Sequence, residues 1–358
     1  MHRFFKSDFF NFKFIRIFST ASYGGAEIWE CHVAASDIAN DDPESWHRAW
    51  LGQANKARAL GDEAMRTGDR VSARRTFLRA SNYYRASRYM FHDAPHAPDA
   101  RVLPLALKVI DTFVQALPLG NGPAFAVSIP FEPYPLPGYL YLPPASKRLK
   151  QSVPLVISLG EADPIQEELY YVYAASGPDL GYSKNLGRGS CSDGRRPPCV
   201  PTGKWSSAEC WTSSSVACAS MGGYYALHAA AEPRIHACVY IDPFYDMWDF
   251  HDGHGHGRVR SRPGWKLDWP SGSLGMDTLV EMMKFTLRRP DGSSRLDDVK
   301  CPVFVSGATQ SLYLEPEETL RVFNALEHLG DDRREMWIGR SPEEGGLLAK
   351  IGAIGLSV

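Results

Sequence analysis

The chain has 358 residues, long enough for one large domain or two moderate ones. Apolar residues make up 44% and aromatic residues 12% of the sequence, which is ordinary for a globular enzyme. The formal net charge of −2 gives no basic field, so nucleic-acid binding is not expected. The seven cysteines are odd in number and lack zinc-ribbon spacing. They indicate buried thiols in a reducing compartment, and we expect a cytoplasmic protein without metal or other cofactor.

The first 18 residues are basic and aromatic. Lys6, Asp8, Lys13 and Arg16 interrupt the apolar residues, so the segment lacks the continuous hydrophobic region of a signal peptide. We expect its phenylalanines to be buried in the mature fold. The sequence shows no stretch near the roughly 20 apolar residues that span a bilayer, so no membrane partner is expected.

Residues 1–118 are predicted to be mostly helical. Asp42 and Pro43 mark the start of an amphipathic helix that ends at Gly68. A second helix is expected from Ser72 to about Phe91, and a third over 103–117. The arginines of the second helix form either a solvated edge, which we favour, or a substrate-facing one: Arg74, Arg75, Arg79, Arg85 and Arg88.

From about residue 119 the pattern changes to alternating strands and helices. The predicted strands cover 125–131, 138–142, 153–160, 236–241 and 302–306, and the predicted helices begin near Ile165 and cover 276–289 and 316–329. The run over 153–160 is almost wholly apolar, as a buried parallel strand should be. This order predicts an α/β fold with a mostly parallel sheet. We therefore expect a helical cap over 1–118 and an α/β core over 119–358.

The segment 184–215 does not fit this order. It is rich in Ser, Gly, Arg, Pro and Cys and has almost no aliphatic residues. A stretch of this length without secondary structure is uncommon inside a compact domain. Two explanations stand equally: an atypical surface insertion, or a mistranslated part of the gene.

The segment Cys218-Ala219-Ser220-Met221-Gly222-Gly223 lies between a short apolar stretch and a helix-like run. It matches the G-x-S-x-G nucleophile elbow, with Cys218 in place of the first glycine. Small residues are needed two positions before and after the serine, because the sharp turn brings backbone segments close together. The helix after Ser220 would direct free N–H groups at a developing oxyanion. The alternative is an ordinary Ser/Gly turn before an alanine-rich helix.

The elbow is one of several segments that together resemble a known family. The others are 23–27 (YGGAE), 44–46 (ESW) with Trp50, and 72–85 (SARRTFLRASNYYR), and the strand ends at 241–246 and 307–308 agree. The chain resembles fungal secondary-metabolite α/β-hydrolases with an N-terminal helical cap. Among these are polyketide-shortening hydrolases of pigment pathways and hydrolases of fusarin and cytochalasan clusters; a bacterial dihydroxypseudooxynicotine hydrolase is more distant. The resemblance covers roughly residues 1–183 and 216–353.

This resemblance implies an α/β-hydrolase fold and a serine hydrolase. Its substrate would be a polyketide-derived small molecule, cleaved at an ester, a lactone or an activated C–C bond. The chain departs from the family pattern at three places. Segment 184–215 lacks the strand and helix expected before the elbow, and the turn at 307–313 has Thr309 and Gln310 where the triad acid is expected. The family's triad histidine is expected near the C-terminus, yet the last histidine of this chain, His328, lies in a predicted helix. The C-terminus is therefore expected to be truncated.

Ser220 is the predicted nucleophile, and the N–H groups of Met221 and of the turn near Gly160 are the predicted oxyanion hole. Asp242 and Asp246 follow a predicted strand, and either could serve as the triad acid, although turn and capping roles are favoured for both.

The candidate bases are His251 and His254, in a glycine-rich loop that could also bind a metal or have no chemical role, which is the favoured option. The alternative to an enzyme is a degenerate α/β-hydrolase-fold protein that is inactive or only binds a ligand. The sequence does not give the oligomeric state, and a homodimer is one option.

Overall fold

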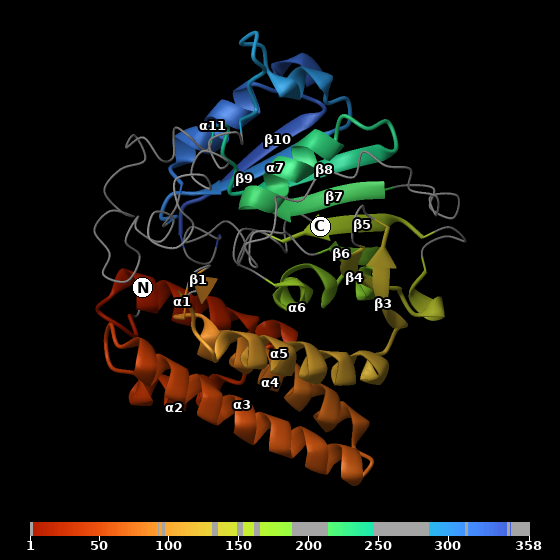
Figure 1. The fold of residues 1–358 in the computed structure, drawn as a ribbon. Coiled ribbons are helices and arrows are strands. Elements are labelled where there is room, and N and C mark those ends of the chain that lie inside the picture. The colour runs from red at the N-terminus through yellow and green to blue at the C-terminus, as the bar shows by residue number, and fades with distance from the viewer. Residues whose placement is uncertain are drawn as a thin grey trace.

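An eight-stranded sheet carries the candidate site, and helices that precede it in the sequence lie along one side of it (Figure 1). The computed structural model describes residues 3–91, 93–94, 97–130, 135–148, 153–160, 165–187, 214–246, 286–311, 314–341 and 344. The main helices are α1 (Asp8–Phe18), α2 (Ile28–Asp37), α3 (Pro43–Arg66), α4 (Arg70–Arg88), α5 (Val102–Ala116), α6 (Gln166–Leu169), α7 (Ser220–Ala229) and α11 (Pro316–Asn324). The strands of the sheet are β3 (Ala124–Ile129), β4 (Leu136–Tyr141), β5 (Leu155–Leu159), β6 (Ser183–Gly187), β7 (Ser214–Ala219), β8 (Ile235–Ile241), β9 (Val303–Ala308) and β10 (Arg334–Gly339). A separate pair joins β1 (Asp93–Ala94) to β2 (Ala97–Pro98).

The three helices predicted before residue 118 are confirmed as α3, α4 and α5. The Asp42 side chain accepts a hydrogen bond from the Glu44 N–H at 2.9 Å, and Pro43 occupies the first helical position, so α3 begins where the sequence predicts. The helices α1 and α2 were not individually predicted. Four phenylalanines of α1 are buried, as expected, and Phe10 and Phe14 contact the tryptophans of α3.

A buried ion-pair cluster joins these helices to the core. The Nε atom of Arg16 on α1 lies 2.6 Å from Oε1 of Glu168 on α6, and Nη1 of Arg85 on α4 lies 3.3 Å from the other oxygen. All three side chains are at least nine-tenths buried, and removal of one partner would leave an uncompensated buried charge. The favoured solvated role is therefore wrong for Arg85, because its guanidinium faces Glu168. It is also wrong for Arg79, which pairs with Glu30 at 3.0 Å.

The sheet has the order β10-β9-β8-β7-β5-β6-β4-β3. The strands from β10 to β6 pair in parallel, and β4 and β3 add antiparallel pairs at one edge. The predicted mostly parallel sheet is confirmed. Two strands were not predicted: β6, whose last four residues lie in the polar segment 184–215, and the edge strand β10. The rest of that segment up to residue 213 lies outside the described residues.

Helices flank both faces of the sheet. On one face, α7 and α11 pack on a core formed with β7, β8 and β9, and on the other, residues of α4, α5 and α6 meet aromatic residues of β4. The predicted helix over 316–329 is confirmed as α11 followed by a short turn of helix, η9 (Glu327–Leu329). The predicted helix over 276–289 lies mostly outside the described residues. Its last four residues are not helical, because Thr286 and Arg288 form isolated bridges with Asp246 and Ser294.

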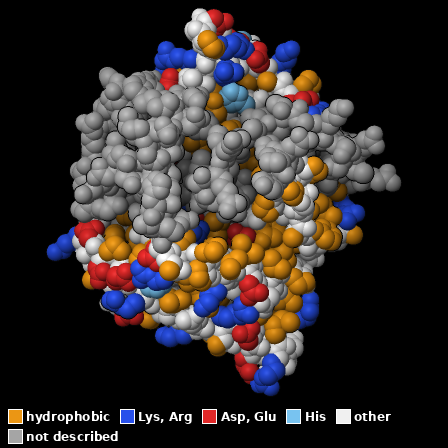
Figure 2. Space-filling view, in the orientation of Figure 1, with side chains coloured by type: hydrophobic (Ala, Val, Ile, Leu, Met, Phe, Trp, Pro, Cys, Tyr) orange, Lys and Arg blue, Asp and Glu red, His pale blue; other side chains and the backbone are white. Residues whose placement is uncertain are grey.

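One face of α5 is apolar and exposed. Hydrophobic side chains gather over the lower half of the molecule in Figure 2, where Figure 1 places the N-terminal helices. Those of α5 are Leu103, Leu107, Ile110 and Val114, at helical spacing. Within the described residues, the helical segment 102–119 has the length and apolar composition of a membrane-crossing helix. This corrects the expectation that no such stretch exists, although the opposite face of α5 packs in the protein core.

Candidate active site

Ser220 lies at the junction between β7 and α7. The strand ends at Ala219, the helix begins at Ser220, and the Ser220 backbone has φ +49°. A left-handed backbone is unfavourable for a residue with a side chain, and it persists only where the surrounding structure holds it. The strand–turn–helix context predicted from the sequence is confirmed, and the geometry is that of a nucleophile elbow. Ser220 is half-buried, so the turn leaves it partly accessible.

The neighbouring glycines are needed because the turn packs directly on other backbone. A Cβ atom at Gly222 would lie 2.6 Å from the Leu159 carbonyl oxygen and 2.7 Å from that of Gly160. A Cβ atom at Gly223 would overlap the ring of Tyr240 on β8. The start of α7 therefore packs against the ends of β5 and β8, as the small-residue argument predicts.

Cys218 has a role of its own in place of the usual glycine. Its Sγ accepts a hydrogen bond from the Leu159 N–H at 3.1 Å, just beyond the last paired residues of β5 and β7. The thiol thus satisfies a backbone donor where the ladder ends. Burial raises the pKa of Cys218 to about 12, so the group stays a neutral thiol.

The first N–H groups of α7 offer an anion site beside Ser220. The first four N–H groups of a helix have no partner within it, and the helix dipole favours negative charge there. Met221 is the second residue of α7, and its side chain is buried in the core beneath the sheet. Gly160 follows β5 and lies against Gly222, so the two predicted oxyanion segments meet at this edge of the sheet.

Asp242 follows β8, the strand next to the one that ends just before Ser220. Ala219 pairs with Ile241, so the residues that follow them end neighbouring strands, and Asp242 also has a left-handed backbone, with φ +51°. The residue is 2% exposed, and its carboxylate accepts a hydrogen bond from Ser311 Oγ at 3.2 Å. Burial raises the pKa of Asp242 to about 7, and the bond from Ser311 opposes that rise.

Ser311 was not singled out in the sequence, although it lies in the 307–313 turn where the triad acid was expected. Its position in that turn could have indicated it, because a polar side chain after β9 can reach the end of the neighbouring strand β8. Asp242 and Ser311 together place one carboxylate near the edge at which that acid was expected.

Asp246 has other partners. It accepts a hydrogen bond from Thr286 Oγ1 at 3.0 Å and lies 3.6 Å from Nε of Arg288. These contacts tie the end of the β8 loop to the segment before β9, which is a structural role. Of the two candidate acids, Asp242 is therefore the better placed.

The predicted bases His251 and His254 lie outside the described residues. Of the histidines that the structure describes, none hydrogen-bonds to Ser220 or Asp242. His328 Nε2 lies 2.9 Å from the Val299 carbonyl oxygen. His228 packs edge-on against Tyr224, and burial lowers its pKa to about 4, with a smaller contribution from Arg295. Among the described residues no group of three or more His, Cys, Asp or Glu is arranged to hold a metal.

Three aromatic residues of α3 and α4 are core residues. Trp50, Tyr83 and Tyr84 are buried, and the two tyrosine hydroxyls bond to Glu30 and Asn55. All three belong to the apolar core of the N-terminal helices.

Comparisons with known proteins agree with this architecture. No family model matches the chain. The hydrolyase poxO of Penicillium oxalicum is 57% identical over 409 positions, covering 100% of this chain and 96% of the relative. The alpha/beta hydrolase psoB of Aspergillus fumigatus is 37% identical, covering 100% and 92%, and the hydrolyase ccsE of Aspergillus clavatus is 38% identical, covering 99% and 95%. The poxO alignment has more positions than this chain has residues, so that relative carries segments that this chain lacks.

Two solved structures share the arrangement. The 2,6-dihydroxy-pseudo-oxynicotine hydrolase superposes with a TM-score of 0.68 at 20% identity, covering 90% of this chain and 89% of that one. AbyA5 superposes with a TM-score of 0.62 at 13% identity, covering 93% and 89%. At this level of identity the likeness concerns the fold.

Proposed function

This chain belongs to the fungal α/β-hydrolases of secondary-metabolite clusters, and from that premise we propose that it is a serine hydrolase with Ser220 as nucleophile. The family and the α/β-hydrolase fold are those predicted from the sequence. The observation that carries the proposal is the left-handed backbone of Ser220 at the end of β7. This conformation lifts the hydroxyl out of the strand and sets it beside the first turn of α7.

The proposed reaction is acyl transfer through a covalent intermediate. Ser220 Oγ attacks the carbonyl carbon of the substrate while a base takes the hydroxyl proton, and the carbonyl oxygen becomes an oxyanion. The Met221 N–H and an N–H near Gly160 would bind this oxyanion, at a helix end whose dipole favours negative charge. Collapse expels the leaving group, which takes the proton back from the base. Water then hydrolyses the acyl-enzyme by the same steps.

We assign the triad acid to Asp242. It is buried at the end of the strand next to Ser220, whereas Asp246 is occupied by Thr286 and Arg288. A carboxylate in this place would orient the base and stabilise its protonated form. His251 and His254, which follow Asp246 in the sequence, remain the candidate bases.

The proposed substrate is a polyketide-derived small molecule, cleaved at an ester, lactone or activated C–C bond. Family membership supports this class, because all three bonds present a carbonyl carbon to the nucleophile. The helices α1–α5 would form a cap that excludes water from the reacting carbonyl. Cys31, Cys218, Cys238 and Cys301 are free and buried, which accords with a reducing, cytoplasmic location.

The test is the Ser220→Ala variant. The parent should hydrolyse p-nitrophenyl butyrate and form a covalent adduct with a fluorophosphonate probe at Ser220, found by peptide mass spectrometry. The variant should lose both while its circular dichroism spectrum and melting temperature stay close to those of the parent. Ester turnover that persists in the purified variant would refute the nucleophile assignment.

A second candidate is a degenerate hydrolase that only binds a ligand. It is favoured by one observation: the described histidines have contacts away from Ser220 and Asp242. In that case the parent protein would neither react with the fluorophosphonate nor turn over the ester, yet would bind a conjugated small molecule. The His251→Ala and His254→Ala variants separate the two candidates, because only an enzyme has turnover to lose.

A further inference from the structure

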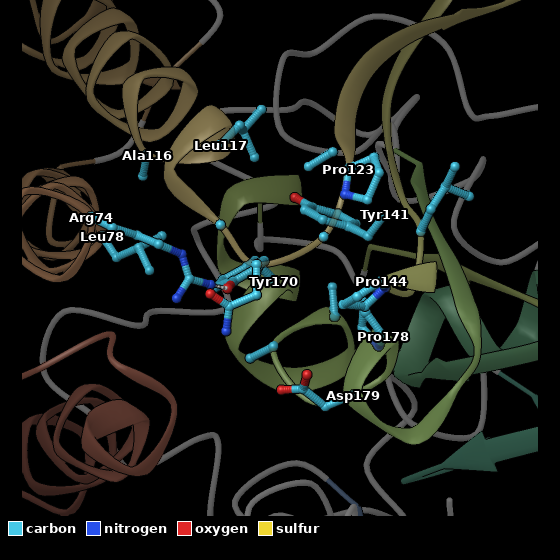
Figure 3. Close-up of a pocket in the computed structure, with 17 residues that line it drawn as sticks. Arg74, Leu78, Ala116, Leu117, Pro123, Tyr141, Pro144, Tyr170, Pro178 and Asp179 are labelled. Atoms are coloured by element: carbon cyan, nitrogen blue, oxygen red, sulfur yellow. Dashed lines mark hydrogen bonds between the residues drawn. The ribbon is translucent and has the colours of Figure 1, made fainter. Parts of the chain in front are cut away.

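A pocket of about 110 Å³ lies at the seam between the N-terminal helices and the sheet (Figure 3). Its lining comes from α4, the end of α5, the loop into β3, the end of β4 and the turns after α6. Ser220, Met221, Gly222 and Gly160 do not line it. The pocket is therefore separate from the nucleophile elbow.

Arg74 supplies a cation to the pocket. Its Nη2 donates a hydrogen bond to the Tyr170 hydroxyl at 2.6 Å, which is a neutral partner. Within the described part of the chain, no carboxylate lies within ion-pair distance of Arg74, although Arg79 and Arg85 on the same helix are both paired. A guanidinium has five donors in a planar fork, so most of them remain available to a planar anion.

Tyr141 supplies an unmet hydroxyl on the opposite wall. The side chain is 4% exposed, and its hydroxyl oxygen has no hydrogen-bond partner among the described residues. In Figure 3 its ring lies across the pocket from Arg74, with Tyr170 between the two. A buried hydroxyl without a hydrogen-bond partner is destabilising, and a ligand oxygen in the pocket would supply that partner.

Asp179 limits the total charge that the pocket accepts. It is exposed, lies on the short helix η5 (Pro178–Leu180) and lines the pocket on a different element from Arg74. The two charges cancel at long range, so a polyanion gains little here. One carboxylate near Arg74, with a neutral or cationic remainder toward Asp179, suits this pair.

We propose that this pocket binds a small monocarboxylate, held by the guanidinium of Arg74 and the hydroxyls of Tyr170 and Tyr141. The volume sets the size: a cavity of about 150 Å³ holds the six non-hydrogen atoms of benzene, so this pocket of about 110 Å³ encloses about four or five. That is the carboxylate of butyrate and the one or two carbons next to it. Such a ligand would join α4 of the cap to β4 and the turns of the core, and this role does not depend on the activity of Ser220.

The experiment is saturation-transfer NMR titration of the full chain with butyrate, its neutral isostere butyramide, and 4-aminobutyrate. Butyrate should bind at least about tenfold more tightly than butyramide, because the charge-assisted fork contact is lost in the amide. The zwitterion should bind at least as well as butyrate, since its ammonium faces Asp179. The Arg74→Gln variant should bind butyrate about tenfold or more weakly than the parent and bind butyramide with the same affinity as the parent.

Three controls keep the result interpretable. Arg75→Gln removes the adjacent, exposed arginine of α4 and should leave butyrate affinity unchanged. Arg74→Lys keeps the charge but not the fork and should bind butyrate with intermediate affinity. Ser220→Ala should bind butyrate as the parent does, which excludes binding in the hydrolase site. Equal affinity for butyrate in the parent and Arg74→Gln, equal affinity for butyrate and butyramide, or no butyrate binding up to about 10 mM would each overturn the proposal.

Discussion

The Asp242→Asn variant should lose a large part of the pH dependence of stability. The Asp242 carboxyl is buried, and burial raises its pKa from 3.8 to about 7 in the folded protein. In an unfolded chain an aspartate ionises near pH 3.9. Because the folded-state pKa is the higher one, the folded protein holds this proton more tightly. Its contribution to stability is therefore complete below about pH 4 and is lost as pH rises to about 7.

The size of the effect follows from the difference between the two pKa values. That difference is about three pKa units, and one unit corresponds to 1.36 kcal/mol, so the parent should lose about 4 kcal/mol of unfolding free energy across this range. Asparagine has a similar shape and does not ionise. Other titrating groups are common to both proteins and cancel in the difference between them.

The assay is urea unfolding of the parent and of Asp242→Asn at pH steps between about 4 and 8. The difference in unfolding free energy between the parent and the variant should fall in the parent's disfavour as pH rises to about 7 and then stay constant. Ser311→Ala removes the hydrogen bond that lowers the pKa of Asp242, so the loss of unfolding free energy in this variant should continue to higher pH than in the parent. Parallel stability curves for the parent and Asp242→Asn would refute the placement of a buried, titrating carboxyl beside Ser220.

Two further predictions concern the elbow and the cap. Ser220→Gly should be inactive, because it lacks the proposed nucleophile. It should nevertheless unfold with about 1 kcal/mol more free energy than the parent, because glycine takes the φ of +49° without strain. A lower urea midpoint for the variant would contradict the elbow geometry. Removal of residues 1–118 should make the remaining chain aggregate, as measured by light scattering. The deletion removes Arg16 and Arg85, the partners of the buried Glu168, and exposes the aromatic residues of β4. A soluble and active remaining chain would show that the cap is dispensable.

The parts of the fold that follow from local pattern were predictable. The strand β5 is a nearly continuous apolar run, and α3 has a capping aspartate, a proline at its first position and an apolar stripe. The elbow was predictable because close backbone approach restricts which residues can stand beside Ser220. In each case the chemical constraint lies within a few residues of the feature it determines.

The parts set by distant partners were not predictable. The strand β6 reads Ser-Lys-Asn-Leu-Gly, and its backbone is held by β5 and β4 on either side rather than by its own composition. The edge strand β10 carries Arg334 and Glu335 among its apolar residues, which weakens the strand pattern. The buried position of Arg85 depends on Glu168, more than 80 residues away. The sequence of α4 alone favours a solvated face, because it contains no carboxylate to pair with.

The backbone at the two strand ends argues that side-chain chemistry, and not folding alone, determines these positions. Among the described residues, three non-glycine residues have a positive φ, and two of them are Ser220 and Asp242, which follow paired residues of β7 and β8. Each costs of order 1–2 kcal/mol in this conformation. Glycine would give the same turns without that cost. A turn at the end of a strand needs neither a hydroxyl nor a carboxylate for its backbone. The presence of a hydroxyl and a carboxyl group at adjacent strand ends therefore favours an active hydrolase over a protein that has kept only the fold.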